Sequence, residues 1–125
     1  MVGTLQPLNG TLTTVGAGTL AAALLLGENI TRTGPTGAFA DTFDTAALIN
    51  AALNQSASGF GGTAWYVTYV NNTAYVATLT APAGGSFTLN GQSAAIPASS
   101  VAELLVTVSA GGAVTVTVLY RFSYS

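Results

Sequence analysis

Asp41 and Asp44 are the closest pair of carboxylates along the 125-residue chain, so they are the first candidates for chemistry. Two neighbouring carboxylates can serve a glycosidase. They can also contribute to a calcium site, but calcium prefers about six to eight oxygen ligands and no ligand-dense loop surrounds this pair. Both flank the start of a predicted helix, where a carboxylate accepts hydrogen bonds from free backbone N–H groups. We therefore interpret them as capping residues and predict no catalytic or metal-binding residue.

Other residue types that carry out catalysis are missing. The chain has no His, Cys or Lys, so Ser99 and Ser100 lack the partner that activates a serine nucleophile. The absence of Cys also excludes disulfides and thiolate metal sites. The glycine-rich segment 59–62 has no lysine and runs from a helix into a strand, the reverse of a phosphate-binding loop. We predict that the protein is not an enzyme and binds no cofactor.

Charged side chains are scarce. Two arginines and four acidic residues make up 5% of the chain, against about 25% in an average soluble domain. Two arginines without lysine cannot form the basic patch that phosphate backbones require, so we predict no nucleic-acid partner. The uncharged surface instead suits contact with other protein. Arg32 and Arg121 are expected to pair with a carboxylate or to cross a subunit boundary, and both are candidate interface residues.

The longest strongly apolar run, residues 20–26, is far shorter than the roughly twenty residues of a membrane span. No basic segment precedes it, as one would in a simple signal peptide. We expect neither a membrane-spanning segment nor a cleaved export signal.

The chain is long enough for one domain, preceded by a segment of different character. Residues 1–18 contain four glycines and one proline and show no helical or alternating period. This segment is either a frayed terminus or an extended arm whose apolar side chains contact a neighbour. We predict an arm over residues 1–18 and a single domain over residues 19–125. The candidate interface residues of the arm are Leu5, Leu8, Leu12 and Val15.

Two helices are predicted before the strands. Thr19 is a predicted N-cap for a short helix over residues 20–26, which ends at Gly27. A short strand over 29–33 and a turn over 34–37 follow. Asp44 is the predicted cap of a second helix, from Thr45 to about Asn54. Its predicted apolar face consists of Leu48, Ile49, Ala52 and Leu53.

From Thr63 onward the pattern is that of β-strands. Residues 64–70 and 73–80 are rich in aromatic and β-branched residues, and Asn71-Asn72 between them suits a two-residue hairpin turn that would place Val67 opposite Val76. Shorter strands are expected at 86–89, turned by Asn90-Gly91, and near Ile96.

A second hairpin joins residues 101–109 to 113–124. Only a three-residue loop over 110–112, with Gly112 in the left-handed conformation, sets the valine rows of the two strands on one face, with Val108 opposite Val114. The other face is polar but uncharged, so Thr115 and Thr117 are candidate interface residues. The chain also lacks the lysines that usually protect sheet edges. We predict a mainly β fold, an antiparallel jelly-roll-like β-sandwich with one short and one medium helix before the main hairpins.

The aromatic residues around the first hairpin leave two interpretations open. They could form a platform that stacks on sugar rings, or they could be divided between the core and an interface. The residues concerned are Trp65, Tyr66, Tyr69 and Tyr75.

Residues 30–53 contain Arg32-Thr33-Gly34-Pro35 and Asp41-Thr42-Phe43-Asp44-Thr45-Ala46, followed by a Thr/Ala/Gly-rich β region. Over roughly residues 20–122 the chain resembles small virion proteins of tailed bacteriophages, of the capsid decoration (cement, or head-stabilising) type. The resemblance implies a jelly-roll-like sandwich that sits on the capsid as a homotrimer and binds the major capsid protein. It would be made in the host cytoplasm and located in the virion. The low charge and the apolar arm depart from many relatives.

Two other functions remain open. One is a tail- or fibre-associated phage protein that recognises a host glycan through apical aromatic residues, although the predicted turns are short. The other is a secreted carbohydrate-binding β-sandwich module, which would have a signal peptide and affinity for polysaccharide.

Overall fold

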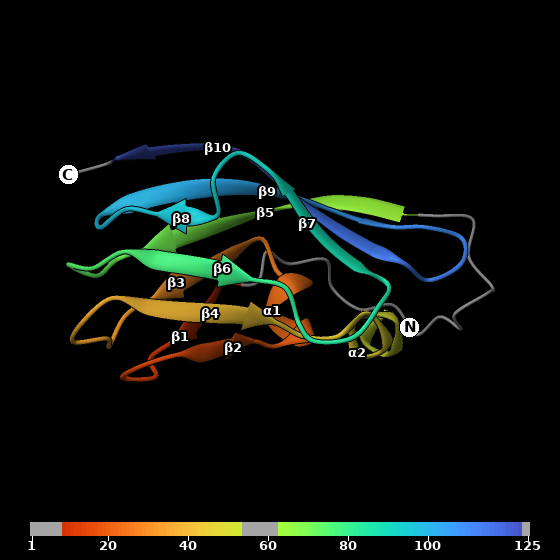
Figure 1. The fold of residues 1–125 in the computed structure, drawn as a ribbon, viewed down its shortest axis with the longest axis horizontal. Helices are drawn as coiled ribbons and strands as arrows, with labels where there is room; N and C mark the ends of the chain where they lie inside the picture. Colours follow the sequence, from red (N-terminus) through yellow and green to blue (C-terminus); the bar gives the residue numbers. More distant parts are fainter. Residues whose placement is uncertain (1–8, 54–62, 124–125) are drawn as a thin grey trace.

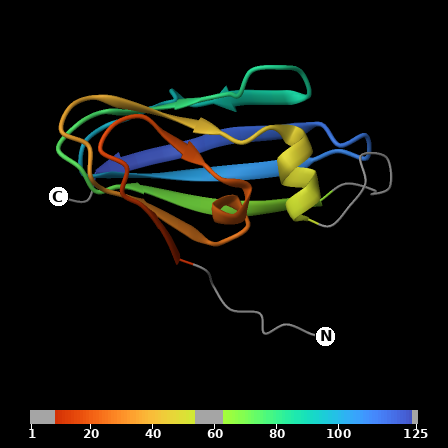
Figure 2. The same ribbon diagram turned by 90° about the horizontal axis from the view of Figure 1, so that it is seen from below.

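A computed structural model describes residues 9–53 and 63–123. They form two stacked sheets, seen as two layers in Figure 2. The six-stranded sheet has the order β1-β3-β5-β9-β10-β7 and the four-stranded sheet the order β2-β4-β6-β8 (Figure 1). The strands are β1 (Asn9–Leu12), β2 (Gly18–Leu20), β3 (Asn29–Arg32), β4 (Phe39–Phe43), β5 (Thr63–Asn71), β6 (Ala77–Thr80), β7 (Phe87–Gly91), β8 (Ala95–Ile96), β9 (Ser100–Val108) and β10 (Val114–Ser123).

The first six strands alternate between the two sheets. In the six-stranded sheet β1, β3 and β5 run parallel, and in the other sheet β2, β4 and β6 run parallel. The chain therefore winds as a coil whose successive turns stack. Strands β9 and β10 then extend the larger sheet in antiparallel fashion, and β7 pairs in parallel with β10 at its edge. The mainly β prediction is confirmed, whereas both sheets are mixed rather than antiparallel.

The predicted hairpin over residues 64–80 is wrong, because β5 and β6 belong to different sheets. Val67 lies opposite Leu104 of β9 instead of Val76. The reason lies in Asn71, which is buried rather than exposed in a turn. Its amide nitrogen donates to the carbonyl oxygens of Tyr75, Ile96 and Pro97 at 2.8, 3.0 and 2.9 Å. These bonds direct the chain across to the other layer.

The predicted hairpin between β9 and β10 is confirmed in its register. Val108 lies opposite Val114 and Val106 opposite Val116. The Ser109 N–H donates to the Ala113 carbonyl at 2.9 Å, which leaves the three-residue loop 110–112. Gly112 has a φ of 87°, in the left-handed region that glycine tolerates best.

Gly112 and its neighbour Gly111 provide a matched test of this loop. Replacing Gly112 with Ala is expected to lower the free energy of unfolding by about 1–2 kcal/mol, because a β-carbon is unfavourable in the left-handed conformation. A β-carbon at Gly111 would meet no atom within 4 Å. Gly111→Ala should therefore leave stability unchanged or slightly higher. Urea denaturation of both variants measures the difference, and equal losses would contradict the assigned loop geometry.

The two helices are α1 (Ala22–Leu25) and α2 (Ala46–Ala52). The predicted capping residues are wrong, because Thr19 lies in β2. Asp44, expected to cap its own helix, accepts a hydrogen bond from the Ala22 N–H of α1 at 2.8 Å. Thr45 caps α2 instead, accepting from the Leu48 N–H at 3.3 Å. Asp44 thus links the two helices across the fold.

The predicted apolar face of α2 is confirmed in part, because Ile49 is buried and Ala52 and Leu53 pack against the core. Leu48 is 51% exposed, whereas Ala46, Ile49 and Asn50 are buried. These three positions follow the i, i+3, i+4 spacing of one helix face, so a polar residue takes a core position. The Asn50 amide nitrogen donates to the carbonyls of Ala46 and Gly112, both at 2.8 Å, which compensates for its burial.

The predicted arm is partly incorporated in the domain. Residues 9–18 form β1, the loop after it and the first residue of β2, and β1 pairs with β3. Leu12 packs against the core and Val15 is exposed. Leu5 and Leu8 lie outside the described residues, as does the glycine-rich segment 59–62.

The core fills the space between the sheets. The largest contribution comes from β9 and β10, whose inward valines lie opposite one another. The fully buried apolar side chains include Leu20, Leu25, Ile30, Ile49, Val67, Tyr69, Ile96, Leu104, Val106 and Val116. Within the described ranges no helix has the length and hydropathy that crossing a membrane requires.

Candidate functional site

The structure separates the six charged residues into groups with different roles. Arg32 and Asp41 are both fully buried and form an ion pair. The Arg32 Nε donates to both carboxylate oxygens of Asp41, at 3.0 and 2.8 Å. Arg32 lies at the end of β3 and Asp41 in the middle of β4, so the pair joins the two sheets. Of the two roles expected for Arg32, pairing with a carboxylate is the correct one, and its assignment to an interface is wrong.

The remaining guanidinium nitrogens of Arg32 hold the loop between β1 and β2. Nη1 donates to the carbonyls of Thr14 and Thr33 at 2.7 and 2.8 Å, and Nη2 donates to the Gly16 carbonyl at 2.5 Å. The Phe39 ring lies 4.6 Å from the guanidinium carbon. At Gly18 a β-carbon would lie 2.9 Å from Leu12 Cδ2, 3.0 Å from Asp41 Oδ1 and 3.1 Å from Nη2, so any larger residue would crowd the ion pair.

Tyr69 completes this buried cluster. Its hydroxyl donates to Asp41 Oδ2 at 2.6 Å. Burial raises the pKa of the Tyr69 phenol, the hydrogen bond to Asp41 and the Asp41 charge raise it further, and Arg32 opposes them. The phenol therefore stays a protonated donor. Because all three side chains are buried and paired, the cluster is suited to stabilising the fold rather than to binding a substrate.

The aspartates predicted to cap a helix do not form a joint site. Asp41 belongs to the buried cluster, and Asp44 caps α1. Within the part of the chain that the structure describes, no group of three or more His, Cys, Asp or Glu residues could hold a metal ion.

The outer face of the six-stranded sheet, turned away from the smaller sheet, is a broad surface with little charge. Val70, Val101 and Phe122 lie side by side across β5, β9 and β10. On these strands the outer face consists of Ala64, Tyr66, Thr68, Val70, Val101, Glu103, Leu105, Thr107, Thr115, Thr117, Tyr120 and Phe122. Glu103 is its single charged residue.

The predicted interface residues of β10 lie on or beside this face. Thr115 and Thr117 are half-buried, and the Thr117 hydroxyl donates to the Asn90 side-chain oxygen at 2.9 Å. Tyr120 and Phe122, which sequence reasoning missed, are each 51% exposed and stack with ring centroids 5.9 Å apart. Exposed stacked aromatic rings are typical of protein-binding surfaces.

Arg121 is the one cation at the surface of the described chain. Its Nη1 donates to the Ala95 carbonyl at 2.8 Å, and it forms no ion pair with any described residue. Arg121 and Phe122 border a hollow of about 270 Å³ beside Pro97. The side chain is therefore held at one edge of the sheet and remains accessible.

A larger pocket, of about 630 Å³, lies where α1 leads into β3. It is bordered by Glu28, Glu103, Trp65 and Tyr66, among others. We call it the acidic pocket. Tyr66 is 61% exposed, whereas the Trp65 indole N–H is engaged with the Leu25 carbonyl at 2.6 Å. Glu103 accepts a hydrogen bond from the Thr68 hydroxyl at 2.7 Å.

The acidic pocket was not predicted, because Glu28 and Glu103 are far apart in the sequence. Thr68 of β5 pairs with Asn29 on one side and with Glu103 on the other, and this brings Glu28, the residue before Asn29, close to Glu103.

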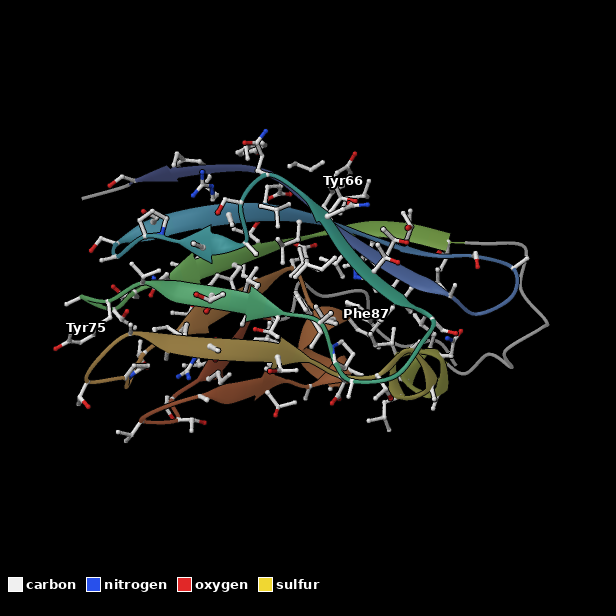
Figure 3. All side chains as sticks on the ribbon, in the orientation of Figure 1. Tyr66, Tyr75 and Phe87 are labelled. Carbon is white, nitrogen blue, oxygen red and sulfur yellow. The ribbon has the colours of Figure 1, made fainter. Side chains whose placement is uncertain are left out.

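The four aromatic residues considered for sugar stacking do not form a platform. Tyr69 is buried, and Tyr75 lies in the loop before β6, well away from Tyr66 on β5 (Figure 3). Figure 3 also shows Phe87 at the start of β7, where its ring stacks on that of Phe43 with 5.5 Å between centroids. Aromatic side chains are thus divided between the core and separate surfaces.

Comparisons with protein-family models, with curated proteins and with solved structures find no match to this chain.

Proposed function

We propose that the protein is a non-enzymatic structural protein of a phage virion, a decoration protein that binds the capsid lattice as a homotrimer and stabilises the head. The observation that carries this proposal is the outer face of the six-stranded sheet, with one charged residue among the twelve that form it on β5, β9 and β10. Broad uncharged surfaces with exposed aromatic residues are typical of protein–protein contacts.

The distribution of charge supports a role in assembly. Arg32, Asp41 and Asp44 serve the fold itself through the buried ion pair and the helix cap. None of them is placed to act on a substrate. The open edge strand β7 carries no charged residue and no proline, so nothing in its sequence opposes pairing with another strand.

The mechanism follows from mass action. Each copy that binds the assembled shell, but not its dissociated subunits, shifts the equilibrium toward the shell. Many copies, each covering a junction between capsid subunits, add their contributions.

Co-sedimentation with empty heads assembled from the major capsid protein of the same virus tests the proposal. We expect saturable binding and a higher temperature of head disruption. Replacing Phe122 with Ser should weaken binding by about tenfold or more, since an aromatic anchor contributes more than about 1 kcal/mol. Leu48→Ser, which alters an equally exposed apolar residue on α2 at the opposite end of the molecule (Figure 1), is the matched control. A protein that ignores heads over the whole concentration range would refute the proposal.

Recognition of a glycan, by a tail-associated protein or a secreted module, has less support. The aromatic residues that such a function would use are dispersed, and only Tyr66 and Trp65 border the same pocket.

A further inference from the structure

We propose that the acidic pocket of one copy binds the Arg121 side chain of a neighbouring copy, and that this contact links the subunits of the oligomer. The inference rests on the proposed self-assembly and specifies which surfaces meet. It assigns a ligand to the pocket of about 630 Å³ between α1, β3 and β5.

Three of the six charged side chains have no role within the described fold that neutralises them, and they can form an ion pair only between copies. Arg32 and Asp41 neutralise each other in the core, and Asp44 caps α1. Of the six charged side chains, this leaves Glu28, Glu103 and Arg121. Both glutamates border the same pocket, and Arg121, which faces the other side of the sheet, is exposed without an ion-pair partner among the described residues. The chain has no lysine, so Arg121 is the cation that a second copy can offer.

The pocket has the chemistry that a guanidinium group requires. Its carboxylates can accept hydrogen bonds from the planar fork of an arginine. The exposed ring of Tyr66 offers a face on which the guanidinium can stack. The pairing of β3 with β5 ends at Asn29 and Thr68, so the backbone groups of Tyr66 on that side of β5 face the pocket. The backbone carbonyl of Tyr66 can accept a further hydrogen bond from the guanidinium group.

The surroundings of Arg121 suit a contact surface. It is flanked in sequence by the exposed, stacked rings of Tyr120 and Phe122. Arginine beside tyrosine and other aromatic residues is the composition in which binding energy concentrates at interfaces. The two rings face the outer side of the sheet, whereas Arg121, which lies opposite the buried Ala102, faces the other side, so a neighbour that contacts both must cover the end of β10.

The two surfaces are different parts of one subunit, so the contact is heterologous. Each copy would present Arg121 to one neighbour and its acidic pocket to another. Such head-to-tail contacts close into a ring when the rotation between copies permits it. A cyclic trimer, the oligomer implied by the resemblance, is one such ring.

Charge reversal tests the contact. Sedimentation equilibrium would be measured for the wild type, Arg121→Glu, Glu103→Arg and the double variant, with unchanged circular dichroism as evidence of folding. Each single reversal should weaken self-association by about tenfold or more, because it places like charges together. The double variant should recover most of the wild-type association. Ala83→Arg, which adds a positive charge in the exposed loop between β6 and β7 and borders neither the acidic pocket nor the hollow beside Arg121, should have no effect.

The outcomes separate this inference from the proposed function. Unchanged association in Arg121→Glu, or no recovery in the double variant, overturns the inference. A wild-type monomer that still binds heads overturns both the inference and the trimer, and leaves only the binding of heads in place. A Glu103 variant that loses only head binding overturns the inference but not the proposed function, since the pocket would then hold a cation of the capsid. Rescue by the double variant in a protein that ignores heads would support the inference and refute the proposed function.

Discussion

Replacing Arg32 with Met is expected to lower the free energy of unfolding by about 3–5 kcal/mol, because it leaves Asp41 as an unpaired charge in the core. Both side chains have 0% exposed surface, and of its three hydrogen bonds to Arg32 and Tyr69 the Asp41 carboxylate would retain only the one from the Tyr69 hydroxyl. The carbonyls of Thr14 and Gly16 would also lose their donor. Since a domain of this kind is stable by only about 5–15 kcal/mol, the loss is a large fraction of the total.

Thermal and urea denaturation measure this effect. For a domain of this size a loss of 1 kcal/mol lowers Tm by about 3–5 °C, so we expect a decrease of about 10–20 °C. Arg121→Met, which removes the exposed arginine, is the matched control and should change Tm little. Adding Asp41→Asn to Arg32→Met should cost less than the sum of the single changes, because the two side chains interact directly. A loss below about 1 kcal/mol for Arg32→Met would contradict the role assigned to the ion pair.

The elements that sequence predicts correctly are those determined by neighbouring residues. In the β9–β10 hairpin the alternation of valines and the two glycines specify the loop and the register together, and Val108 pairs with Val114 as expected. The strand at Asn29–Arg32 and the existence of a helix after Thr45 follow from equally local patterns.

The elements that were predicted wrongly depend on contacts between distant residues. Asn71 has the composition of a turn, but its amide bonds to Ile96 and Pro97 make it a buried crossing point between the sheets. Asp44 precedes one helix in sequence yet caps the other, because β4 and α1 meet only in the folded chain. Parallel stacking of β1, β3 and β5 leaves no local signal, since each connection passes through the opposite sheet.

The candidate surfaces also depend on contacts between residues that are distant in the sequence. The composition shows that charged side chains are scarce, but it does not show which of them are buried. Arg32 and Arg121 look alike in sequence. Each lies in a strand-like segment, Arg32 between two threonines and Arg121 between two aromatic residues. The fold alone distinguishes them, placing Arg32 between the sheets and Arg121 at an exposed edge. It also brings Glu28 to the same pocket as Glu103.

Val116→Asp and Thr115→Asp, adjacent on β10, should have opposite consequences because they face opposite sides of the sheet. Val116 is fully buried between Val106 of β9 and Leu89 of β7, so a carboxylate there would be dehydrated without a partner. The penalty of several kcal/mol for the charge, added to the lost apolar contacts, is comparable to the whole stability of the domain. We expect Val116→Asp to lack cooperative unfolding and the dispersed amide NMR spectrum of a folded protein.

Thr115 lies on the outer face opposite Thr107, half-buried but within reach of water. Thr115→Asp should therefore fold, with a change of about 1 kcal/mol or less, the range typical of substitutions near the surface. If the outer face is covered in the assembly, the same substitution should weaken self-association or binding to heads, since a charge would be buried there without a partner. Cooperative unfolding of Val116→Asp close to that of the wild type would contradict the two-layer core, whereas loss of folding in Thr115→Asp would contradict the assignment of its face.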